Sequence, residues 1–340
     1  MHTLIIAPNW IGDALLAQPL FGRLRSQDPN QSIDVVAPPW TAPVLARMPE
    51  IDDVVPAAFA HGKFGWSTRR KLGAQLKARH YDRAIVLPNS WKSALVPFFA
   101  DIPVRIGFVG EARYGLLNVR HRLDKAALPL MAERYAKLAE APSEPPHRPL
   151  HGSRLQVDEG NQLIALNRLG LDRSKPIVAM CPGAEFGPSK RWPTRHFATL
   201  AQQLAQQGVA VWLFGSPKDQ PVGDEIVALS NSACVNLCGR TDLYAAIDLL
   251  ALARCVVTND SGLMHVAAAL HRPIVALFGS SSSAHTPPLT DRAHLLTLNL
   301  SCSPCFQREC PLGHHKCMED MLPEMVQTEV QKLSDTRARP

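Results

Sequence analysis

The sequence lacks the features of a membrane or secreted protein. A membrane-spanning helix needs about 18 uninterrupted apolar residues, and the best candidate stretch is broken by Pro97, Asp101 and Pro103. The first residues, Met1-His2-Thr3, lead directly into a short apolar run without the basic region or cleavage site of a secretory signal. The chain also has no internal repeat and no low-complexity tail. These absences predict a cytoplasmic protein.

The glycine fingerprint of dinucleotide-binding enzymes is missing too. The first predicted strand runs into Pro8-Asn9-Trp10-Ile11-Gly12-Asp13, and this turn does not have the G-x-G-x-x-G spacing that holds a pyrophosphate. A nicotinamide or flavin enzyme is therefore disfavoured. The turn does contain Gly12, which permits a tight bend, and Asp13, which we expect at or near the N-terminus of the next helix. Asp13 could act as a base there or simply cap the helix.

A disulfide framework is excluded as well, because the eight cysteines occur in a chain without a secretory signal. Four of them lie in or beside apolar runs and are expected to be small buried hydrophobes: Cys181, Cys234, Cys238 and Cys255. The other four fall within sixteen residues, around His314 and His315: Cys302, Cys305, Cys310 and Cys317. Their spacing resembles a metal knuckle, so this segment could bind a structural zinc or iron–sulfur centre, or carry reduced free thiols on a surface loop.

The net charge of +6 belongs to the first half of the chain. Of the 36 Lys and Arg residues, 21 lie in residues 1–170, together with 15 of the 30 Asp and Glu residues. This excess favours an anionic partner for the first half, or else reflects a solvated surface. The basic residues are scattered rather than gathered into a stripe, which argues against nucleic acid as the partner.

The length and the pattern of apolar runs predict an α/β protein with two domains. Strand-like and helix-like runs alternate, which is typical of parallel sheets built from βαβ units. The predicted strands are residues 4–7, 33–37, 53–56, 83–87, 105–108, 177–181, 210–214, 235–237, 255–258 and 274–278. The predicted helices include residues 67–79, 131–139, 197–207, 224–230, 243–253 and 263–270.

A proline-rich break at residues 141–149 separates the two halves. We therefore expect two Rossmann-like, doubly wound domains, residues 1–165 and 166–340, which face one another across a cleft in the GT-B arrangement. Open α/β folds bind their ligands at the carboxyl ends of the strands, so the cleft is the expected site.

Loops after the strands of the second half carry groups suited to an anion. The Pro- and Gly-rich loop 181–193 contains Lys190 and Arg191, which could neutralise a diphosphate or remain solvated. Residues 256–265 run from a strand through Asp260-Ser261-Gly262 into a helix whose N-terminal dipole favours a phosphate. His265 lies about one turn further on the same face and could add a donor. An ordinary capped helix with an interior histidine has the same pattern, and Asp219, after the preceding strand, could contact a ribose or form an ordinary turn.

Four segments, taken in order along the chain, resemble the ADP-heptose:lipopolysaccharide heptosyltransferases. They are Asn9-Trp10-Ile11-Gly12-Asp13, Leu87-Pro88-Asn89-Ser90-Trp91-Lys92-Ser93-Ala94, Pro182-Gly183-Ala184-Glu185-Phe186-Gly187-Pro188-Ser189-Lys190-Arg191-Trp192-Pro193 and Asn259-Asp260-Ser261-Gly262-Leu263-Met264-His265. The resemblance extends to about residue 290, and the second and third segments are similar to the type II branch of this family. The cysteine cluster departs from the best-known type II members.

The resemblance implies an inverting GT-B transferase that moves L-glycero-D-manno-heptose from ADP-heptose to the first heptose of the lipopolysaccharide inner core. It implies that Asp13 is the general base and that no cofactor is required. It assigns Lys190, Glu185, Asp219, Thr241, Asp260, Ser261, Gly262 and His265 to the donor, and Gly12, Asn89, Ser90, Lys92 and Arg113 to the acceptor.

The acceptor of such an enzyme carries Kdo carboxylates and lipid A phosphates, which agrees with the positive first half. Peripheral contact with the cytoplasmic face of the inner membrane is the corresponding expectation. Two alternatives stay open from the sequence. The chain could be a related transferase for another sugar or core position, or a non-catalytic scaffold that binds a sugar nucleotide.

Overall fold

The computed structural model describes residues 1–57 and 64–335. The chain divides into two units, Met1–Ser153 and Arg154–Pro340. The sequence places the boundary later, after residue 165. The difference concerns helix α7 (Glu159–Leu169), which is joined to the second unit because Asn161 Nδ2 donates to Asp248 Oδ2 at 2.6 Å.

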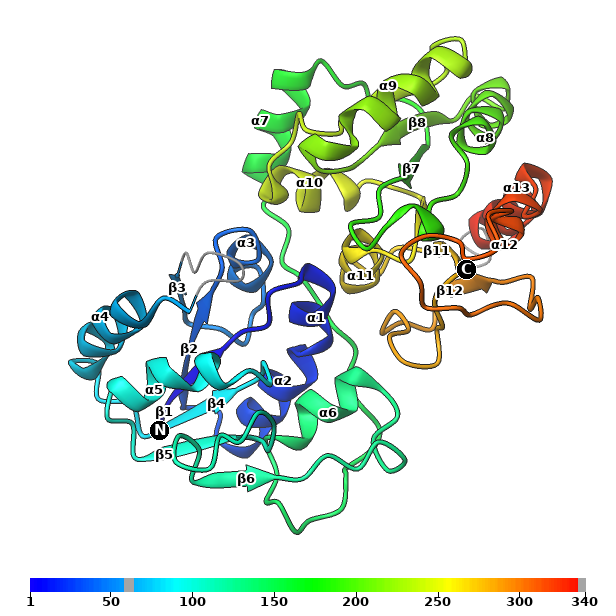
Figure 1. The fold of residues 1–340 in the computed structure, drawn as a ribbon. Coiled ribbons are helices and arrows are strands. Elements are labelled where there is room, and N and C mark those ends of the chain that lie inside the picture. Colours follow the sequence, from blue (N-terminus) through cyan, green and yellow to red (C-terminus); the bar gives the residue numbers. More distant parts are fainter. Residues whose placement is uncertain (58–63, 336–340) are drawn as a thin grey trace. The chain divides into compact units, whose positions relative to one another are not determined.

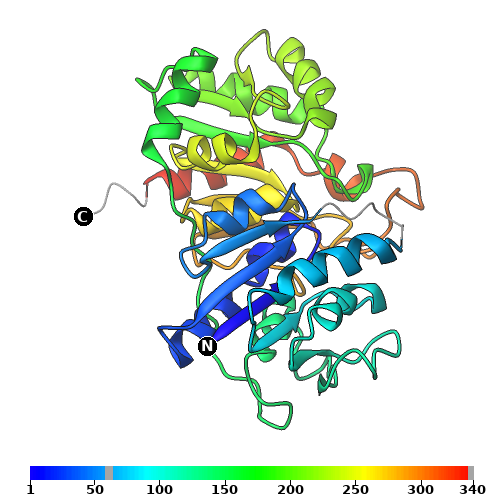
Figure 2. The same cartoon turned by 90° about the vertical axis from the view of Figure 1, so that its left-hand side faces the viewer.

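The first unit contains a six-stranded parallel sheet in the order β3-β2-β1-β4-β5-β6. Its strands are β1 (His2–Ile6), β2 (Ser32–Ala37), β3 (Asp53–Pro56), β4 (Arg83–Val86), β5 (Val104–Phe108) and β6 (Val119–His121). Strands β1 and β2 (blue) run side by side in the same direction (Figure 2). The predicted strands of this half are confirmed to within a few residues. The short edge strand β6 was not predicted, because three residues that include Arg120 and His121 carry no apolar pattern.

Seven helical segments accompany this sheet in the described part of the first unit. They are α1 (Ile11–Leu16), α2 (Gln18–Gln27), α3 (Ala42–Ala46), α4 (Trp66–Lys77), η1 (Trp91–Ala94), α5 (Leu95–Phe99) and α6 (Met131–Lys137). Helix α2 packs against α6, and α4 packs against α5 (Figure 1). Helix α1 also packs against α6, so residues near the start of the chain contact residues more than a hundred positions later.

The second unit repeats this topology. Its parallel sheet has the order β12-β11-β10-β7-β8-β9, made of β7 (Ile177–Cys181), β8 (Ala210–Leu213), β9 (Val235–Asn236), β10 (Cys255–Asn259), β11 (Ile274–Leu277) and β12 (Ala293–Leu296). The other helices are η2 (Pro188–Lys190), α8 (Thr194–Gln206), η3 (Pro217–Asp219), α9 (Gln220–Leu229), α10 (Leu243–Leu250), α11 (Gly262–Ala269), α12 (Lys316–Glu319) and α13 (Pro323–Asp335). The predicted α/β class with two Rossmann-like sheets is confirmed. The edge strand β12 was not predicted.

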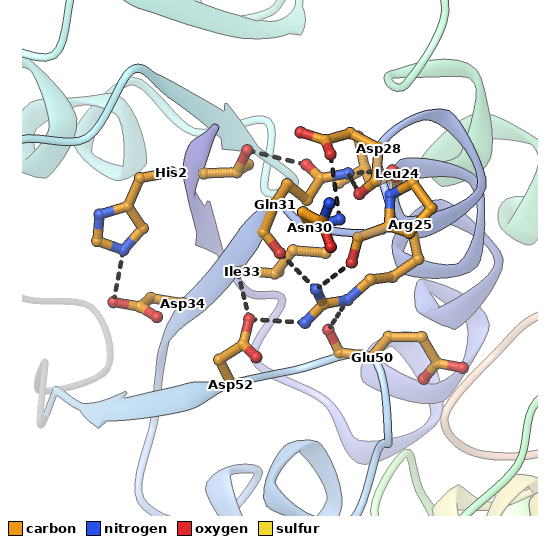
Figure 3. A network of polar contacts seen from close by, with 12 residues as sticks. His2, Leu24, Arg25, Asp28, Asn30, Gln31, Ile33, Asp34, Glu50 and Asp52 are labelled. Carbon is orange, nitrogen blue, oxygen red and sulfur yellow. Dashed lines mark hydrogen bonds and ion pairs between the residues drawn. The ribbon is translucent and has the colours of Figure 1, made fainter.

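The amino ends of strands β2 and β3 are tied together by Arg25 on α2 (Figure 3). Arg25 Nε donates to Glu50 O at 3.0 Å, and its guanidinium also donates to Gln31 O and, at 2.6 Å, to Asp52 Oδ2. Asp52 Oδ2 accepts the backbone N–H of Ile33 at 2.7 Å as well. These contacts stabilise the sheet edge opposite to the carboxyl ends of the strands, where ligands of open α/β folds bind.

No helix within residues 1–57 and 64–335 is long and apolar enough to cross a membrane. This agrees with the interrupted apolar runs of the sequence.

His121, at the end of β6, is a buried titratable group. Its side chain is 1% exposed, and neither ring nitrogen hydrogen-bonds to a described protein atom. The pKa of His121 is lowered to about 4. Burial is the main cause, the nearby Lys137 ammonium acts in the same direction, and Glu140 opposes the shift. The native structure therefore holds this imidazole in its neutral form at neutral pH.

We expect His121 to make folding acid-sensitive. Because the folded-state pKa lies below the ordinary value of about 6.5, the unfolded chain binds the proton more readily, and stability is lost as the pH falls from about 6.5 towards 4. Between pH of about 7.5 and about 5, the loss from this group should be about 2 kcal/mol. Urea unfolding of the wild type and of His121→Phe at both pH values measures it.

The matched control is His151→Phe, since His151 is exposed. We expect this variant to keep the wild-type pH dependence, whereas His121→Phe should show a smaller one. Equal pH dependence of all three proteins would contradict the assignment to His121.

Candidate functional site

The candidate site residues of each unit lie at the carboxyl edge of its parallel sheet. In the first unit they follow β1, β4 and β5, and in the second unit they follow β7, β8, β9 and β10. Parallel pairing brings these strand ends to one edge, so residues far apart in the sequence become neighbours. The two groups are described separately.

Asp13 is the third residue of helix α1, whose N-cap is Trp10. It lies near the helix N-terminus, as the sequence predicts, and is half-buried. Tyr135 on α6 is 8% exposed, and its hydroxyl hydrogen-bonds to the Asp13 carboxylate. Burial raises the pKa of Tyr135 well above its ordinary value, and the charge of Asp13 raises it further, while Arg134 lowers it. Tyr135 therefore remains a neutral hydrogen-bond donor. No local signal in the sequence links it to Asp13.

Arg113 lies inside the first unit, with a side chain that is 1% exposed. Its Nη1 donates to Pro88 O at 2.7 Å and to Ser93 Oγ at 3.3 Å, and its Nη2 donates to Asn89 Oδ1 at 3.4 Å. Burial lowers the pKa of Arg113. The guanidinium thus holds the loop after β4, where Asn89 is exposed and Ser90 and Lys92 are half-buried. The resemblance assigned Arg113 to the acceptor itself, but its donors are directed to the loop.

A surface pocket of about 250 Å³ lies next along the sheet, at strands β5 and β6 and the residues that follow them. It is lined by Val109, Tyr114, Arg120 and Arg122, which follow or form the ends of β5 and β6. The Arg120 guanidinium lies 5.5 Å from the centre of the Tyr114 ring. Two arginines at one pocket suit a carboxylate or a phosphate. No signal in the sequence marks these residues, because scattered arginines have no recognisable spacing.

The second unit places an ion pair at the carboxyl edge of its sheet. Lys190 Nζ lies 2.5 Å from Asp260 Oδ2, and their side chains are 17% and 8% exposed. The same carboxylate oxygen accepts the hydroxyl of Ser281 at 2.6 Å. The Lys190 ammonium also lies 5.0 Å from the centre of the Phe186 ring. A cation that is largely shielded from water is well suited to bind an anion such as a diphosphate.

Asn259, fully buried at the end of β10, holds both ends of the loop that carries Lys190. Its Nδ2 donates to Pro182 O at 2.8 Å, and its Oδ1 accepts the backbone N–H of Trp192 at 3.1 Å. The side chain therefore sets the path of residues 182–192. Asn259 belongs to one of the family-like segments, but its role as a link between two loops is not visible in the sequence.

The turn after β10 leads into helix α11 as predicted, with Ser261 at the N-cap. The Ser261 side chain makes no capping hydrogen bond, and its Oγ lies 3.3 Å from Thr258 Oγ1. Gly262 is the first helical residue. His265 is 5% exposed, and burial lowers its pKa to about 4, with Lys190 lowering it and Asp260 raising it. His265 is therefore neutral at neutral pH. It can form a hydrogen bond with a ligand, but it cannot form an ion pair with it.

Of the three other predicted donor residues, Glu185 and Asp219 have local partners. Glu185 forms an exposed ion pair with Lys218 at 2.6 Å. Asp219 Oδ2 accepts the backbone N–H and the hydroxyl of Ser216, at 2.9 and 2.7 Å, and so stabilises its own turn. Thr241 follows β9 and directly precedes the N-cap of α10. All three lie at the carboxyl edge, where the sequence predicts them.

The cysteine-rich segment contacts the Lys190 loop through Gln307 and Arg308. Ser189 donates from its N–H to Arg308 O at 3.2 Å and from its hydroxyl to Gln307 O at 2.5 Å. Gly187 has a positive φ of 158°, and a Cβ at this position would lie 2.4 Å from Arg308 O. Only glycine therefore fits where the two segments cross. This contact could not be read from the sequence, because the segments are separated by more than a hundred residues.

A structural metal at the cysteine cluster, which the sequence left open beside free thiols, is not supported. Within residues 1–57 and 64–335, no group of three or more His, Cys, Asp or Glu side chains could hold a metal ion. The thiols do influence one another, because burial and the charges of Cys305, Cys310 and Cys302 raise the pKa of Cys317. They are not gathered around a common centre. The other four cysteines are buried, as expected.

Comparisons with known proteins match nearly the whole chain. The family model described as "Glycosyltransferase family 9 (heptosyltransferase)" matches residues 69–316. Lipopolysaccharide heptosyltransferase 2 of Salmonella typhimurium is 46% identical over 98% of each chain. Lipooligosaccharide heptosyltransferase 2 of Haemophilus influenzae is 45% identical over the full length of both chains. The solved structure of E. coli ADP-heptose lps heptosyltransferase II is 44% identical, with a TM-score of 0.90 over 99% of this chain and 100% of that one.

Asn259→Ala tests whether this side chain holds the Lys190 loop. The substitution leaves Pro182 O and the N–H of Trp192 without their buried partner, which should lower the free energy of unfolding by about 2 to 4 kcal/mol. Urea denaturation measures the change. Asn167→Ala, at an exposed position on α7, is the control and should change stability by less than about 0.5 kcal/mol. Similar small effects of both substitutions would show that the loop does not depend on Asn259.

Proposed function

We propose a mechanism for this chain on one premise: the chain belongs to glycosyltransferase family 9, the heptosyltransferases. The resemblance inferred from its motifs is thereby confirmed. The protein is a glycosyltransferase that transfers heptose in the biosynthesis of the lipopolysaccharide core. The observation that carries the mechanism is the shielded Lys190 ammonium, which is held at the carboxyl edge of the second sheet among residues suited to a sugar-nucleotide diphosphate.

The second unit is proposed to bind the ADP-heptose donor. Lys190 and the first backbone amides of α11, at Gly262 and Leu263, would stabilise the negative charge that develops on ADP as the bond between the sugar C1 and the phosphate oxygen breaks. His265 would donate a neutral hydrogen bond to the same group. Glu185, Asp219 and Thr241 follow three neighbouring strands and remain proposed contacts to the nucleoside and the sugar.

The first unit is proposed to bind the acceptor, the lipopolysaccharide core that bears one heptose. The exposed loop after β4 would contact the sugar through Asn89, Ser90 and Lys92, while Arg113 holds the loop in place. Arg120 and Arg122 would bind a carboxylate or phosphate of the acceptor at their pocket.

Asp13 is the proposed general base. Its carboxylate would accept the proton of the attacking acceptor hydroxyl as that oxygen forms the new bond to C1 and ADP departs with the electrons of the broken bond. Attack from the face opposite to the leaving group inverts the configuration at C1. The products are the extended core, ADP and the protonated base, and the reaction as proposed needs no cofactor.

A cytoplasmic location and peripheral contact with the inner membrane are also proposals. They are supported by the positive excess of residues 1–170, which favours encounter with anionic lipids and with the acceptor's own phosphates.

Asp13→Asn should lower kcat by about 10² to 10⁴-fold, because the amide cannot accept the proton. The affinity for ADP should stay within about threefold of the wild type, since the proposed donor residues belong to the second unit. The assay uses ADP-heptose and a truncated core acceptor, with the mass and linkage of the product determined. The exposed Asp101→Asn is the control. Retained turnover would assign the base elsewhere, and activity with a uridine donor alone would reject the proposed substrate.

Tyr135→Phe should lower kcat by about tenfold and move the acidic limb of the kcat/KM profile to higher pH. The physical reason is that the hydroxyl donates a hydrogen bond that favours the charged form of the Asp13 carboxylate. Tyr81→Phe is a matched control, because Tyr81 is buried too but donates to Asp34, at 2.7 Å, near the amino end of the sheet. An unchanged pH profile for Tyr135→Phe, or an equal displacement in both variants, would argue against a role for Tyr135 in positioning the base.

A further inference from the structure

Ser281 follows strand β11, in a loop that belongs to none of the sequence motifs described above. Its hydroxyl donates to Asp260 Oδ2 at 2.6 Å, the same oxygen that lies 2.5 Å from Lys190 Nζ. Asp260 is 8% exposed. A single buried carboxylate oxygen therefore has one cationic and one neutral partner.

The loop that carries Ser281 is fixed by its neighbour, Ser280. The Ser280 side chain is 2% exposed, and its Oγ lies 3.0 Å from Ser189 Oγ, within hydrogen-bond distance. Its backbone carbonyl accepts the N–H of Phe306 at 2.7 Å. Because Ser189 directly precedes Lys190, the loop after β11 is connected to the Lys190 loop on one side and to Asp260 on the other. Ser281 is thus held at a defined position relative to the ion pair.

Two anions compete for the Lys190 ammonium. In the structure it pairs with Asp260, and in the proposed function it binds the donor diphosphate. A diphosphate that draws the ammonium towards itself weakens its contact with a carboxylate that is almost completely removed from water. A buried carboxylate that loses a partner is costly unless another donor remains. The Ser281 hydroxyl is such a donor, and it does not need to move.

We propose that Ser281 is a positioning residue for donor binding, because its hydroxyl keeps the Asp260 carboxylate hydrogen-bonded while Lys190 turns to the diphosphate. The inference rests on the proposed role of Lys190. It extends the donor site to a fifth strand end, that of β11, and it makes the affinity for a nucleoside diphosphate depend on a side chain that does not touch the nucleotide.

Calorimetric titration with ADP tests this proposal on the full chain. Ser281→Ala should weaken ADP binding by about tenfold, the effect of one hydrogen bond to a charged group. Ser281→Thr, which keeps the hydroxyl, should bind within about twofold of the wild type. Ser282→Ala is the control, because Ser282 Oγ accepts the N–H of Ala284 at 3.1 Å and belongs to the next turn. Circular dichroism and urea unfolding establish that each variant is folded.

A double-mutant cycle with Lys190→Met identifies the path of the effect. If Ser281 acts through Lys190, Ser281→Ala should add less than about twofold to the loss already caused by Lys190→Met. An undiminished tenfold effect in that background, a wild-type affinity of Ser281→Ala, or a failure of Ser281→Thr to restore binding would each overturn the proposal. If Lys190→Met alone leaves ADP affinity unchanged, the proposed function of Lys190 fails instead, and the two failures are distinguishable.

Discussion

Parallel strand pairing is the constraint on which the rest of this structure depends. In each six-stranded sheet all strands run in one direction, so every loop that follows a strand opens at the same edge. Lys190, after β7, and Asp260, after β10, are brought to 2.5 Å in this way. The opposite edge of the first sheet is closed by Arg25 and its partners. The proposed ligand-binding residues of each unit thus lie at the carboxyl edge of its sheet, away from the edge that Arg25 holds in the first unit.

Three of the residues proposed to bind the donor, Lys190, Asp260 and His265, are largely buried, so the charge state of each depends on its neighbours. Lys190 and Asp260 neutralise each other while water is largely excluded, and Asn259 holds the loop that makes this possible. His265 remains neutral beside them because burial disfavours its charged form. In the proposed function, this arrangement offers the Lys190 ammonium to a diphosphate, with His265 beside it as a neutral donor.

Apolar patterning predicted the central strands well, because a strand that is covered on both faces by helices is a continuous apolar run. Strand β7 has the predicted bounds, and the turn after β10 leads into α11 at Ser261 as expected. The edge strands β3 and β9 were predicted as well, but β6 and β12 were not, since both are short and contain charged or histidine side chains. Among the proposed site residues, Asp13 and Lys190 were selected from their place after a strand and from a family resemblance.

The sequence by itself determined the class of fold, the positions of the strand-end loops and the family, because these depend on local periodicity and on short contiguous motifs. Only the tertiary structure decided what each side chain in those loops contacts. It turned Arg113 inward to hold a loop and placed Tyr135 against Asp13 and Ser281 against Asp260. Such contacts join residues that are distant along the chain, and burial, which sets their charge and their partners, exists only after the helices and sheets have packed.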